Sequence, residues 1–298
     1  MTEKEFRAGF IALIGRPNVG KSTLLNHIVG QKLSIVSSKP QTTRRRVLGV
    51  RTTGHAQLVF VDTPGLHGGH RKQINRAMNR TATGAIADAD LVLWMVEALR
   101  WQPEDDFVLA RLTESRQPVG LVVNKMDRVK PPSRLLPFLD EIARKREFAF
   151  VIPVSATAGT NVERLEMSVA ELLPRSPALF PPEQVTDLPQ RVWVTEIIRE
   201  KLLERLHDEL PHAVAVEIDH WQDEDGLTRL AATIWVERDS QKAIVIGAHG
   251  QVLKAVGRDA RLEIERELER KVFLELWVKV QSEWSDDLRK LRALGLGE

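Results

Sequence analysis

Short apolar runs separated by longer mixed segments characterise the first half of the chain. Each run has the length of a typical strand, and an unbroken apolar run indicates a strand buried on both faces of a sheet. Segments with apolar residues at helical spacing, such as Ser22–Val29 and Glu104–Leu112, lie between the runs. This alternation predicts an α/β fold with a mostly parallel sheet and helices on both faces. The predicted strands are Phe10–Ile14, Gln57–Val61, Leu91–Val96, Val119–Val123 and Phe148–Val154.

A proline-rich segment, Arg175–Gln190, interrupts this alternation. Proline fixes its own φ and lacks an N–H, so this density opposes both a helix and a central strand. We therefore expect a semi-rigid linker. The predicted domains are residues 1–175 and 191–282, with the linker at 176–190 and a tail at 283–298. The prolines concerned are Pro174, Pro177, Pro181, Pro182 and Pro189.

The second half shows a different order of elements: helix, strand, strand, helix, helix, strand. An acidic turn, Gln222–Gly226, separates the two adjacent strands, and Ser240 is expected to cap the short helix that follows them. This order predicts an α+β domain. The elements are a helix Val192–Leu206, strands Ala213–Asp219 and Leu227–Glu237, a helix ending at Ile246, a helix Gln251–Arg270 and a strand Val272–Val280.

Large apolar residues of the second half are assigned mainly to cores. Three tryptophans, Trp193, Trp235 and Trp277, are expected to be buried rather than to stack nucleobases. The tail is expected to form a final amphipathic helix. Its apolar positions are Trp284, Leu288, Leu291 and Leu294.

Composition limits the class of protein. The 298 residues are 43% hydrophobic and 28% charged, which is ordinary for globular chains of about two domains. The absence of cysteine excludes disulfides, thiolate zinc sites and a cysteine nucleophile. The longest apolar run, Leu91–Val96, is far shorter than a membrane span. Because Met1–Arg7 leads directly into an apolar strand, we expect no signal peptide and a cytoplasmic protein.

The net charge of +2 hides an uneven distribution. Through Arg175 the chain has 26 basic and 17 acidic residues, and after it 17 basic and 24 acidic residues. The halves therefore carry +9 and −7. A globally basic nucleic-acid binder would not show this pattern, so any nucleic-acid partner requires a specific motif.

A phosphate-binding motif follows the first predicted strand: Gly15-Arg16-Pro17-Asn18-Val19-Gly20-Lys21-Ser22 matches G-x-x-x-x-G-K-[ST]. Its glycines let backbone N–H groups turn toward an anion, and the following helix adds its positive dipole end. Lys21 is expected to reach the β- and γ-phosphates and Ser22 to ligate Mg²⁺. The predicted fold class of this half is therefore a P-loop NTPase.

A second motif follows the predicted strand Gln57–Val61. Asp62-Thr63-Pro64-Gly65 supplies a carboxylate for Mg²⁺ and a glycine N–H that can approach a γ-phosphate. Alone it would be read as a turn, but its position after a strand makes it specific.

Asn124-Lys125-Met126-Asp127 indicates the base. The Asp127 carboxylate can accept hydrogen bonds from guanine N1–H and the 2-amino group, and adenine lacks both donors. Asn124 is expected to tie this loop to the phosphate loop, and the Lys125 stem to lie across the ring. Ser155 and Ala156 are expected to offer backbone N–H groups to guanine O6. The motifs together predict GTP rather than ATP.

A loop with two glycines, Gly247-Ala248-His249-Gly250, joins two helices of the second half. Glycines at this spacing let a nucleic-acid backbone lie close, and with the order of elements they match a type II KH domain that holds about four nucleotides of a single strand. Lys254, Arg258 and Arg261 continue as a basic stripe with Gln251. The opposite, apolar face has Leu253, Val256, Ala260 and Ile264.

Together these residues resemble the Era family of bacterial GTPases. The resemblance covers nearly the whole chain, and the C-terminal KH domain distinguishes this family from other GTPases with a similar first half. It rests on Gly15–Ser22, Gln41–Arg44, Asp62–Leu66, Asn124–Asp127, Val154–Ala156, Glu196–Lys201 and Gly247–Gly250.

The resemblance implies a GTP-regulated assembly factor that binds single-stranded RNA near the 3′ end of small-subunit (16S) ribosomal RNA. It implies that Thr43, rather than Thr42, completes the Mg²⁺ shell, and that Lys21, Thr43 and Gly65 serve catalysis. Family members are cytoplasmic, can associate peripherally with the inner membrane, and are expected to be monomers. By analogy with related GTPases, Asn18 is a candidate to coordinate K⁺. Ala248 and His249 depart from the family, which more often has a lysine in this loop.

Several alternatives stay open. Leu66 stands where many GTPases have a water-orienting glutamine, so we expect slow turnover that awaits a partner or another loop element. The chain is then either a GTP-hydrolysing switch that controls RNA binding or a GTP-stabilised RNA-binding scaffold with negligible turnover. A third interpretation gives the second domain a protein partner. Arg44, Arg45 and Arg46 could supply a transition-state arginine, but a partner patch or solvated surface is favoured. His67 and His70 are read as a flexible loop rather than a metal site.

Overall fold

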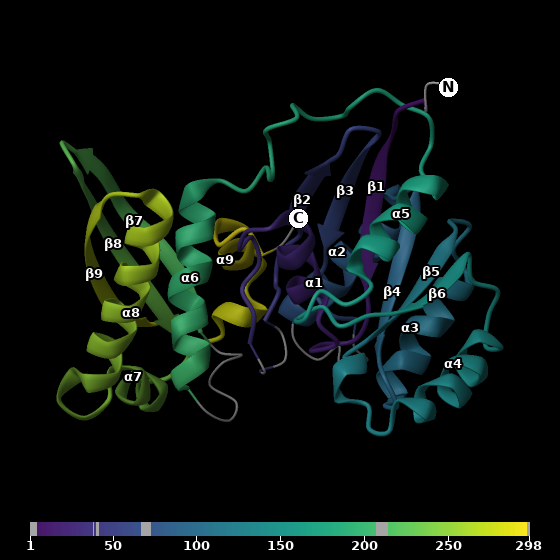
Figure 1. Cartoon of the computed structure of the whole chain (residues 1–298). Helices are drawn as coiled ribbons and strands as arrows, with labels where there is room; N and C mark the ends of the chain where they lie inside the picture. Colours follow the sequence, from purple (N-terminus) through teal and green to yellow (C-terminus); the bar gives the residue numbers. More distant parts are fainter. Residues whose placement is uncertain (1–4, 38, 40–41, 67–72, 207–213, 297–298) are drawn as a thin grey trace. The chain divides into compact units, whose positions relative to one another are not determined.

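The computed structural model describes residues 5–37, 39, 42–66, 73–206 and 214–296. The chain divides into two compact units (Figure 1). The first comprises residues 1–34, 43–70 and 75–187, and the second comprises residues 35–42, 71–74 and 188–298.

A six-stranded sheet forms the centre of the first unit, with strand order β2-β3-β1-β4-β5-β6. β2 is antiparallel to β3 and every other pair is parallel. The strands are β1 (Arg7–Ile14), β2 (Val47–Thr52), β3 (Ala56–Asp62), β4 (Leu91–Glu97), β5 (Val119–Asn124) and β6 (Phe150–Pro153).

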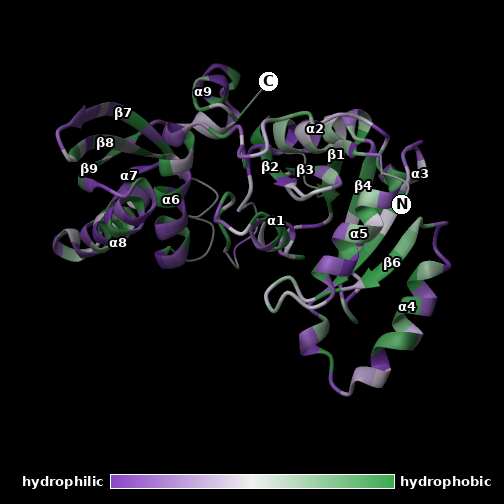
Figure 2. Cartoon of the chain, turned by 45° about the horizontal axis from the view of Figure 1, so that its top comes forward, coloured by the Kyte–Doolittle hydropathy of each residue, from purple (hydrophilic) through white to green (hydrophobic). Residues whose placement is uncertain are grey.

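Helices cover both faces of this sheet. One core packs α1 (Lys21–Val29) and α5 (Val162–Leu172) against one face. The other packs α2 (Gln73–Asp88), α3 (Pro103–Thr113) and α4 (Leu135–Ala143) against the opposite face. The predicted P-loop-type α/β fold is confirmed. In Figure 2, β4 and β6 are coloured hydrophobic along most of their length, and β4, inside the sheet, is buried on both faces as its unbroken apolar run predicts.

The edge strand β2 was not predicted. Its run Val47–Thr52 follows three arginines and contains Gly49 near its middle, which weakens the strand pattern. The glycine has a packing role, because a Cβ at Gly49 would lie 2.6 Å from Leu25 Cδ1. A side chain there would collide with the Leu25 and Val29 side chains of α1.

The proline-rich segment is irregular, as predicted, but it lies along the first unit. Val50 N donates to Val185 O at 2.8 Å, and Thr186 Oγ1 donates to Leu48 O at 2.7 Å. The buried Gln57 side chain accepts from Leu179 N and Phe180 N and donates to Phe180 O. Backbone that proline excludes from a ladder is thus satisfied by side chains and by single bonds to the sheet.

The second unit has the predicted order of elements. Its sheet order is β7-β8-β9, with β7 antiparallel and β9 parallel to β8, and α6 and α8 pack on it through one apolar core. In Figure 2, β7 carries long hydrophilic stretches, consistent with a sheet that is buried on one face. The elements are α6 (Gln190–Arg205), β7 (Ala215–Glu224), β8 (Leu227–Val236), α7 (Asp239–Ile246), α8 (Gln251–Leu268), β9 (Lys271–Val280) and α9 (Leu288–Ala293).

Two local predictions for this unit were wrong. The acidic segment Gln222–Gly226 is mostly strand, because β7 continues to Glu224 and only two residues link it to β8. Ser240 does not cap α7. The cap comes from the Gln241 side chain, whose Oε1 accepts from the N–H groups of Glu237 and Arg238 at 2.8 and 3.2 Å.

Side-chain burial also corrects some core predictions. Trp277 is 58% exposed because it lies on the face of β9 that the helices do not cover, whereas Trp193 and Trp235 are half-buried against apolar clusters. In the tail, a short turn and α9 replace one continuous helix. Trp284, Leu291 and Leu294 are buried there, but Leu288 is exposed.

Among the described residues, no helix has both the length and the apolar character needed to cross a bilayer.

Candidate functional site

The phosphate motif forms the loop between β1 and α1. Three of its residues adopt backbone conformations with positive φ: Gly15 at +158°, Asn18 at +64° and Gly20 at +105°. A Cβ at Gly20 would lie 2.2 Å from Asn124 Nδ2, so the loop approaches the Asn124 side chain as only glycine allows. Helix α1 begins at Lys21, directly after this turn. The loop therefore directs the first N–H groups of α1 toward one point at the sheet edge.

Lys21 is buried under this loop. Its Nζ donates to Gly15 O at 3.1 Å and to Arg16 O at 3.2 Å. Burial lowers the pKa of Lys21 to about 8, although the nearby Asp62 carboxylate opposes the shift. The lysine thus has an ammonium group held at the loop with little solvation of its own.

A cluster of oxygen donors lies next to Lys21. Ser22 Oγ donates to Asp62 Oδ2 at 2.7 Å and lies 2.9 Å from Thr43 Oγ1, which is 3.4 Å from the same carboxylate oxygen. Ser34 Oγ also donates to Asp62 Oδ2, at 3.0 Å. The structure therefore brings together the three residues predicted to hold Mg²⁺. Ser34 was missed, because it belongs to no motif.

Asp62 is fully buried, and its Oδ1 has no hydrogen-bond partner among the described residues. Burial raises the pKa of this carboxyl group, while Lys21 and the hydroxyl donors oppose the rise. A buried carboxylate oxygen without a partner is costly unless a cation binds it. Hydroxyl and carboxylate oxygens are the ligands that Mg²⁺ prefers, so this donor set fits that ion.

Gly65 and Leu66 follow β3 and lie against the phosphate loop. A Cβ at Gly65 would lie 2.7 Å from Pro17 N, and Leu66 N donates to Gly15 O at 3.3 Å. The Leu66 side chain is only 1% exposed and packs in the core with α2. It therefore points away from any solvent-accessible phosphate. Thr63 Oγ1 donates to Leu13 O and anchors the same segment, which includes Pro64.

The base motif follows β5. Asn124 Nδ2 donates to Val19 O at 2.8 Å, and Asn124 Oδ1 accepts from Ala156 N at 2.9 Å. Asn124 thus connects three loops at one edge of the sheet, including the predicted tie to the phosphate loop. Lys125 adopts a φ of +65°, Met126 begins a short 3₁₀ turn, and Asp127 within that turn is exposed.

The loop after β6 already uses both N–H groups that were predicted to face guanine O6. Ser155 N donates to Thr160 O at 3.1 Å, and Ala156 N donates to Asn124 Oδ1. Both N–H groups therefore stabilise the loop, and neither is an uncommitted donor for guanine O6. The tight turn after β6 requires these internal bonds because both residues are buried.

The arginine run also differs from the expectation. Arg44 is only 3% exposed, whereas Arg45 is half-buried and Arg46 exposed, so solvated surface describes Arg46 but not Arg44. Gln41 lies outside the described residues, as do His67 and His70. Thr42 belongs to the second unit, where its carbonyl oxygen accepts from the Arg199 guanidinium of α6.

In the second unit, the two-glycine loop forms a short turn between α7 and α8. Gly247, His249 and Gly250 have φ values of +74°, +52° and +76°. A Cβ at Gly247 would lie 2.4 Å from Val252 Cγ2. The first glycine is thus required by both conformation and packing, while Ala248 and His249 form the tip of the turn.

Helix α8 divides its faces as predicted. Val256, Ala260 and Ile264 are buried, and Leu253 is half-buried. The basic stripe is partly neutralised, because Arg258 pairs with Asp259 at 2.8 Å and Arg261 with Glu265 at 3.0 Å. Lys254 is exposed in the first turns after the loop.

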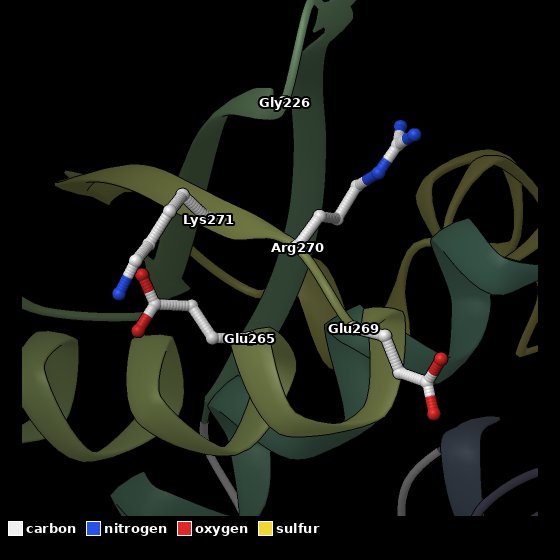
Figure 3. Close-up of a pocket in the computed structure, with 5 residues that line it drawn as sticks. All are labelled: Gly226, Glu265, Glu269, Arg270 and Lys271. Carbon is white, nitrogen blue, oxygen red and sulfur yellow. The ribbon is translucent and has the colours of Figure 1, made fainter.

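A surface hollow of about 550 Å³ lies where α8 ends and β9 begins (Figure 3). Two of its four charged residues pair with neighbours, Glu265 with Arg261 at 3.0 Å and Arg270 with Asp223 at 3.2 Å. In Figure 3, the Arg270 and Glu269 side chains point away from each other rather than toward a common point. The hollow has the character of an ordinary charged surface.

Comparison with known proteins gives a consistent picture. Residues 10–125 match the family described as 50S ribosome-binding GTPase, and residues 209–285 match the KH domain. The GTPase Era of Coxiella burnetii is 50% identical over 290 residues, which cover 97% of this chain and 98% of that protein. The GTPase Era of Histophilus somni is 50% identical over 296 residues, covering 99% of each.

Two solved structures are similar over nearly the whole chain. One is a point variant of Aquifex aeolicus Era bound to GDP and AlF4⁻, with a TM-score of 0.94. The other is Era in complex with MgGDPNP and nucleotides 1506–1542 of 16S ribosomal RNA, with a TM-score of 0.95. Each is 38% identical, and the match covers 98% of this chain and 100% of that one.

Proposed function

This chain belongs to the Era family of GTPases with a KH domain, and from that premise we propose how its own residues carry out nucleotide and RNA binding. The first unit holds GTP at the carboxyl edge of its sheet. The second unit holds a single strand of ribosomal RNA, and the nucleotide state controls that binding during assembly of the small ribosomal subunit.

The observation that carries the nucleotide proposal is the buried Asp62 with its unpartnered Oδ1. Ser22 and Thr43 place hydroxyl oxygens beside it, and these three residues would hold Mg²⁺. The ion neutralises charge on the β- and γ-phosphates when bound. The role of the chain is to orient the phosphates with the loop Gly15–Gly20 and to place the Lys21 ammonium against their oxygens.

Guanine selectivity is assigned to Asp127. Its carboxylate accepts from N1–H and the 2-amino group, and an adenine nucleotide would leave it unpaired, at a cost of roughly 1–3 kcal/mol or more. The Lys125 stem covers one face of the ring. Asn124 acts indirectly, by holding the phosphate loop and the loop at Ala156 in register. Ala156 N already donates to Asn124 Oδ1, so it would reach guanine O6 by sharing its hydrogen between the two oxygens.

The geometry of Leu66 favours slow intrinsic hydrolysis. An apolar side chain cannot orient water, and this one is directed into the core. The same observation keeps a second candidate function, a GTP-stabilised RNA-binding scaffold with negligible turnover. Single-turnover hydrolysis with and without the RNA separates the two. A rate that the RNA raises supports the switch, and no hydrolysis in either case supports the scaffold.

The RNA partner is proposed from the related complex with nucleotides 1506–1542 of 16S ribosomal RNA. In this chain the loop Gly247–Gly250 would admit the strand, with Lys254, Arg258 and Arg261 near its phosphates. The proposed RNA binding is tested by filter binding of an oligonucleotide with the 3′-end sequence of small-subunit rRNA. The affinity is measured with GTP, with GDP and without nucleotide. Equal affinity in all three conditions would contradict nucleotide control, and absent binding would favour a protein partner.

Potassium binding through Asn18 is a separate proposal. It rests on the place of Asn18 in the phosphate-loop motif, where the residue has a left-handed φ of +64°. Turnover measured in potassium and in sodium tests it, and equal rates would remove the role. Cytoplasmic location, peripheral membrane association and a monomeric state stay predictions.

A further inference from the structure

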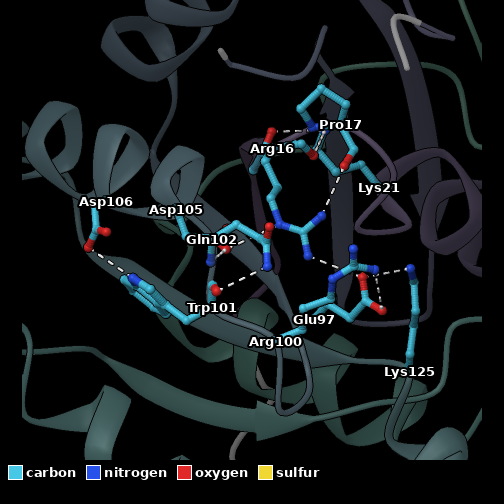
Figure 4. Close-up of polar contacts among 11 residues, drawn as sticks. Arg16, Pro17, Lys21, Glu97, Arg100, Trp101, Gln102, Asp105, Asp106 and Lys125 are labelled. Carbon is cyan, nitrogen blue, oxygen red and sulfur yellow. Dashed lines mark hydrogen bonds and ion pairs between the residues drawn. The ribbon is translucent and has the colours of Figure 1, made fainter. Parts of the chain in front are cut away.

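An ion-pair network connects the phosphate loop to the base motif through residues of neither motif (Figure 4). Glu97 Oε2 accepts from Arg16 Nη2 at 3.1 Å and from Lys125 Nζ at 3.0 Å. Arg16 Nε donates in addition to Asp105 Oδ2 at 3.1 Å. Glu97 thus binds a cation from each nucleotide-binding loop, and Asp105 binds the Arg16 guanidinium a second time.

The sheet topology explains why Glu97 can make both contacts. It is the last residue of β4, which lies between β1, the strand leading to the phosphate loop, and β5, the strand leading to the base motif. Glu97 is in register with Asn124, the residue before Lys125. A side chain at the end of this middle strand is therefore placed between the two loops.

The network is well packed. Arg16 and Asp105 are buried, and Glu97 is mostly covered. Asp105 also caps α3, because its Oδ2 accepts from Gln102 N at 2.9 Å. Burial opposes the ionised form of Glu97, but the hydrogen bonds from Lys125 and Arg16 outweigh it and hold the pKa of Glu97 below its usual value. The acceptor is thus a carboxylate at neutral pH.

These contacts bear on the geometry of both loops. Each nitrogen of the Arg16 guanidinium donates to a protein group, so these bonds hold the side chain in place at the phosphate loop. Lys125 has a left-handed φ that a lysine adopts only where surrounding contacts impose it. The bond to Glu97 fixes the end of the same side chain whose stem would cover the guanine ring.

We propose that Glu97 is a positioning residue for guanine nucleotides, which holds the phosphate loop through Arg16 and the base motif through Lys125. This inference rests on the proposed nucleotide site. Glu97 itself belongs to none of the motifs. Its effect should fall on nucleotide binding and not on the chemical step, because it touches neither the metal ligands nor the residues placed beside the γ-phosphate.

The test is Glu97→Gln in the full chain, which keeps the size and one acceptor but removes the charge. We expect KM for GTP and Kd for GDP to rise together by roughly tenfold, with kcat changed less than about twofold. Glu97→Asp keeps the charge but shortens the reach, so it should give an intermediate effect. Arg100→Gln is the matched control, because Arg100 lies 3.9 Å from Glu97 Oε1 but is exposed, and it should leave both constants unchanged.

A double-mutant cycle separates positioning from general loss of packing. If Glu97 acts through Lys125, the combined Glu97→Gln and Lys125→Ala variant should lose much less affinity than the product of the two single losses. Thermal unfolding without nucleotide shows that each variant is folded, and Glu97→Asp carries the test if Glu97→Gln is not. Unchanged KM, a loss confined to kcat, or fully multiplicative losses would overturn the proposal. Wild-type protein that binds ADP as well as GDP would instead overturn the nucleotide site itself.

Discussion

Lys21 supplies the positive charge that a phosphate loop needs, yet its surroundings work against that charge. Burial lowers its pKa to about 8, from an ordinary value of 10.5. Phosphate oxygens placed beside Nζ would favour the protonated form and raise the pKa well above 8. Nucleotide binding must therefore be linked to proton uptake by Lys21 in mildly alkaline solution.

The size of this effect follows from the two protonation states. With a pKa of about 8, about one tenth of Lys21 is neutral at pH 7 and about three quarters at pH 8.5. GDP binding should take up these fractions of a proton. Because the bound state has the higher pKa, affinity falls as pH rises through 8, by about fourfold between pH 7 and pH 8.5.

Calorimetric titration with GDP and Mg²⁺ in two buffers of different ionisation enthalpy measures the proton number directly. Guanine N1–H also begins to titrate in alkaline solution, so a control is required. Lys21→Arg serves, because arginine stays charged at these pH values while the contribution of the base is retained. Equal proton uptake by wild type and Lys21→Arg at pH 8.5 would refute the shifted pKa and the contact with phosphate.

Three further predictions concern other parts of the chain. Asp127→Asn should shift preference from guanine toward xanthine nucleotides, whose 2-oxo group can accept from the new amide; competition between XDP and GDP checks this, and retained GDP preference contradicts it. His249→Lys should tighten binding of the rRNA oligonucleotide, because the lysine adds about one phosphate contact. The slope of log affinity against log salt concentration should steepen by about one unit, measured by filter binding between about 50 and 200 mM salt. Gln57→Leu removes a buried side chain that makes three hydrogen bonds to the proline-rich segment. It should lower the free energy of unfolding by about 1–3 kcal/mol, which a lower thermal midpoint would show. An unchanged midpoint would mean that Gln57 does not hold the segment.

The parallel strands were predictable because burial on both faces leaves continuous apolar runs, as in Leu91–Val96. The edge strand Val47–Thr52 was not, since its glycine serves the packing of α1 and is read in sequence as a break. The burial predicted for Trp277 was wrong for a different reason. Its type favours a core, and only the arrangement of the helices on one face of the sheet leaves it exposed.

The site followed the same division. Motif residues were predictable because fixed spacing after a strand places them at the carboxyl edge. Ser34, Glu97 and Asp105 were not, because each reaches the site from its own element with no spacing to reveal it. The internal bonds of Ser155 and Ala156 are likewise a product of the folded turn.

The nucleotide site concentrates features that are unfavourable elsewhere in the fold. Asn18 and Lys125 have left-handed φ, and the buried Lys21 and Asp62 have pKa values shifted in opposite directions, both toward the neutral form. A phosphate anion favours the charged lysine, and a hard cation favours the charged aspartate. The charged forms of Lys21 and Asp62 are disfavoured without nucleotide, and they are the forms that bound phosphate and Mg²⁺ would stabilise. Binding at this edge and stability of the first unit are therefore coupled through these residues rather than through the sheet beneath them.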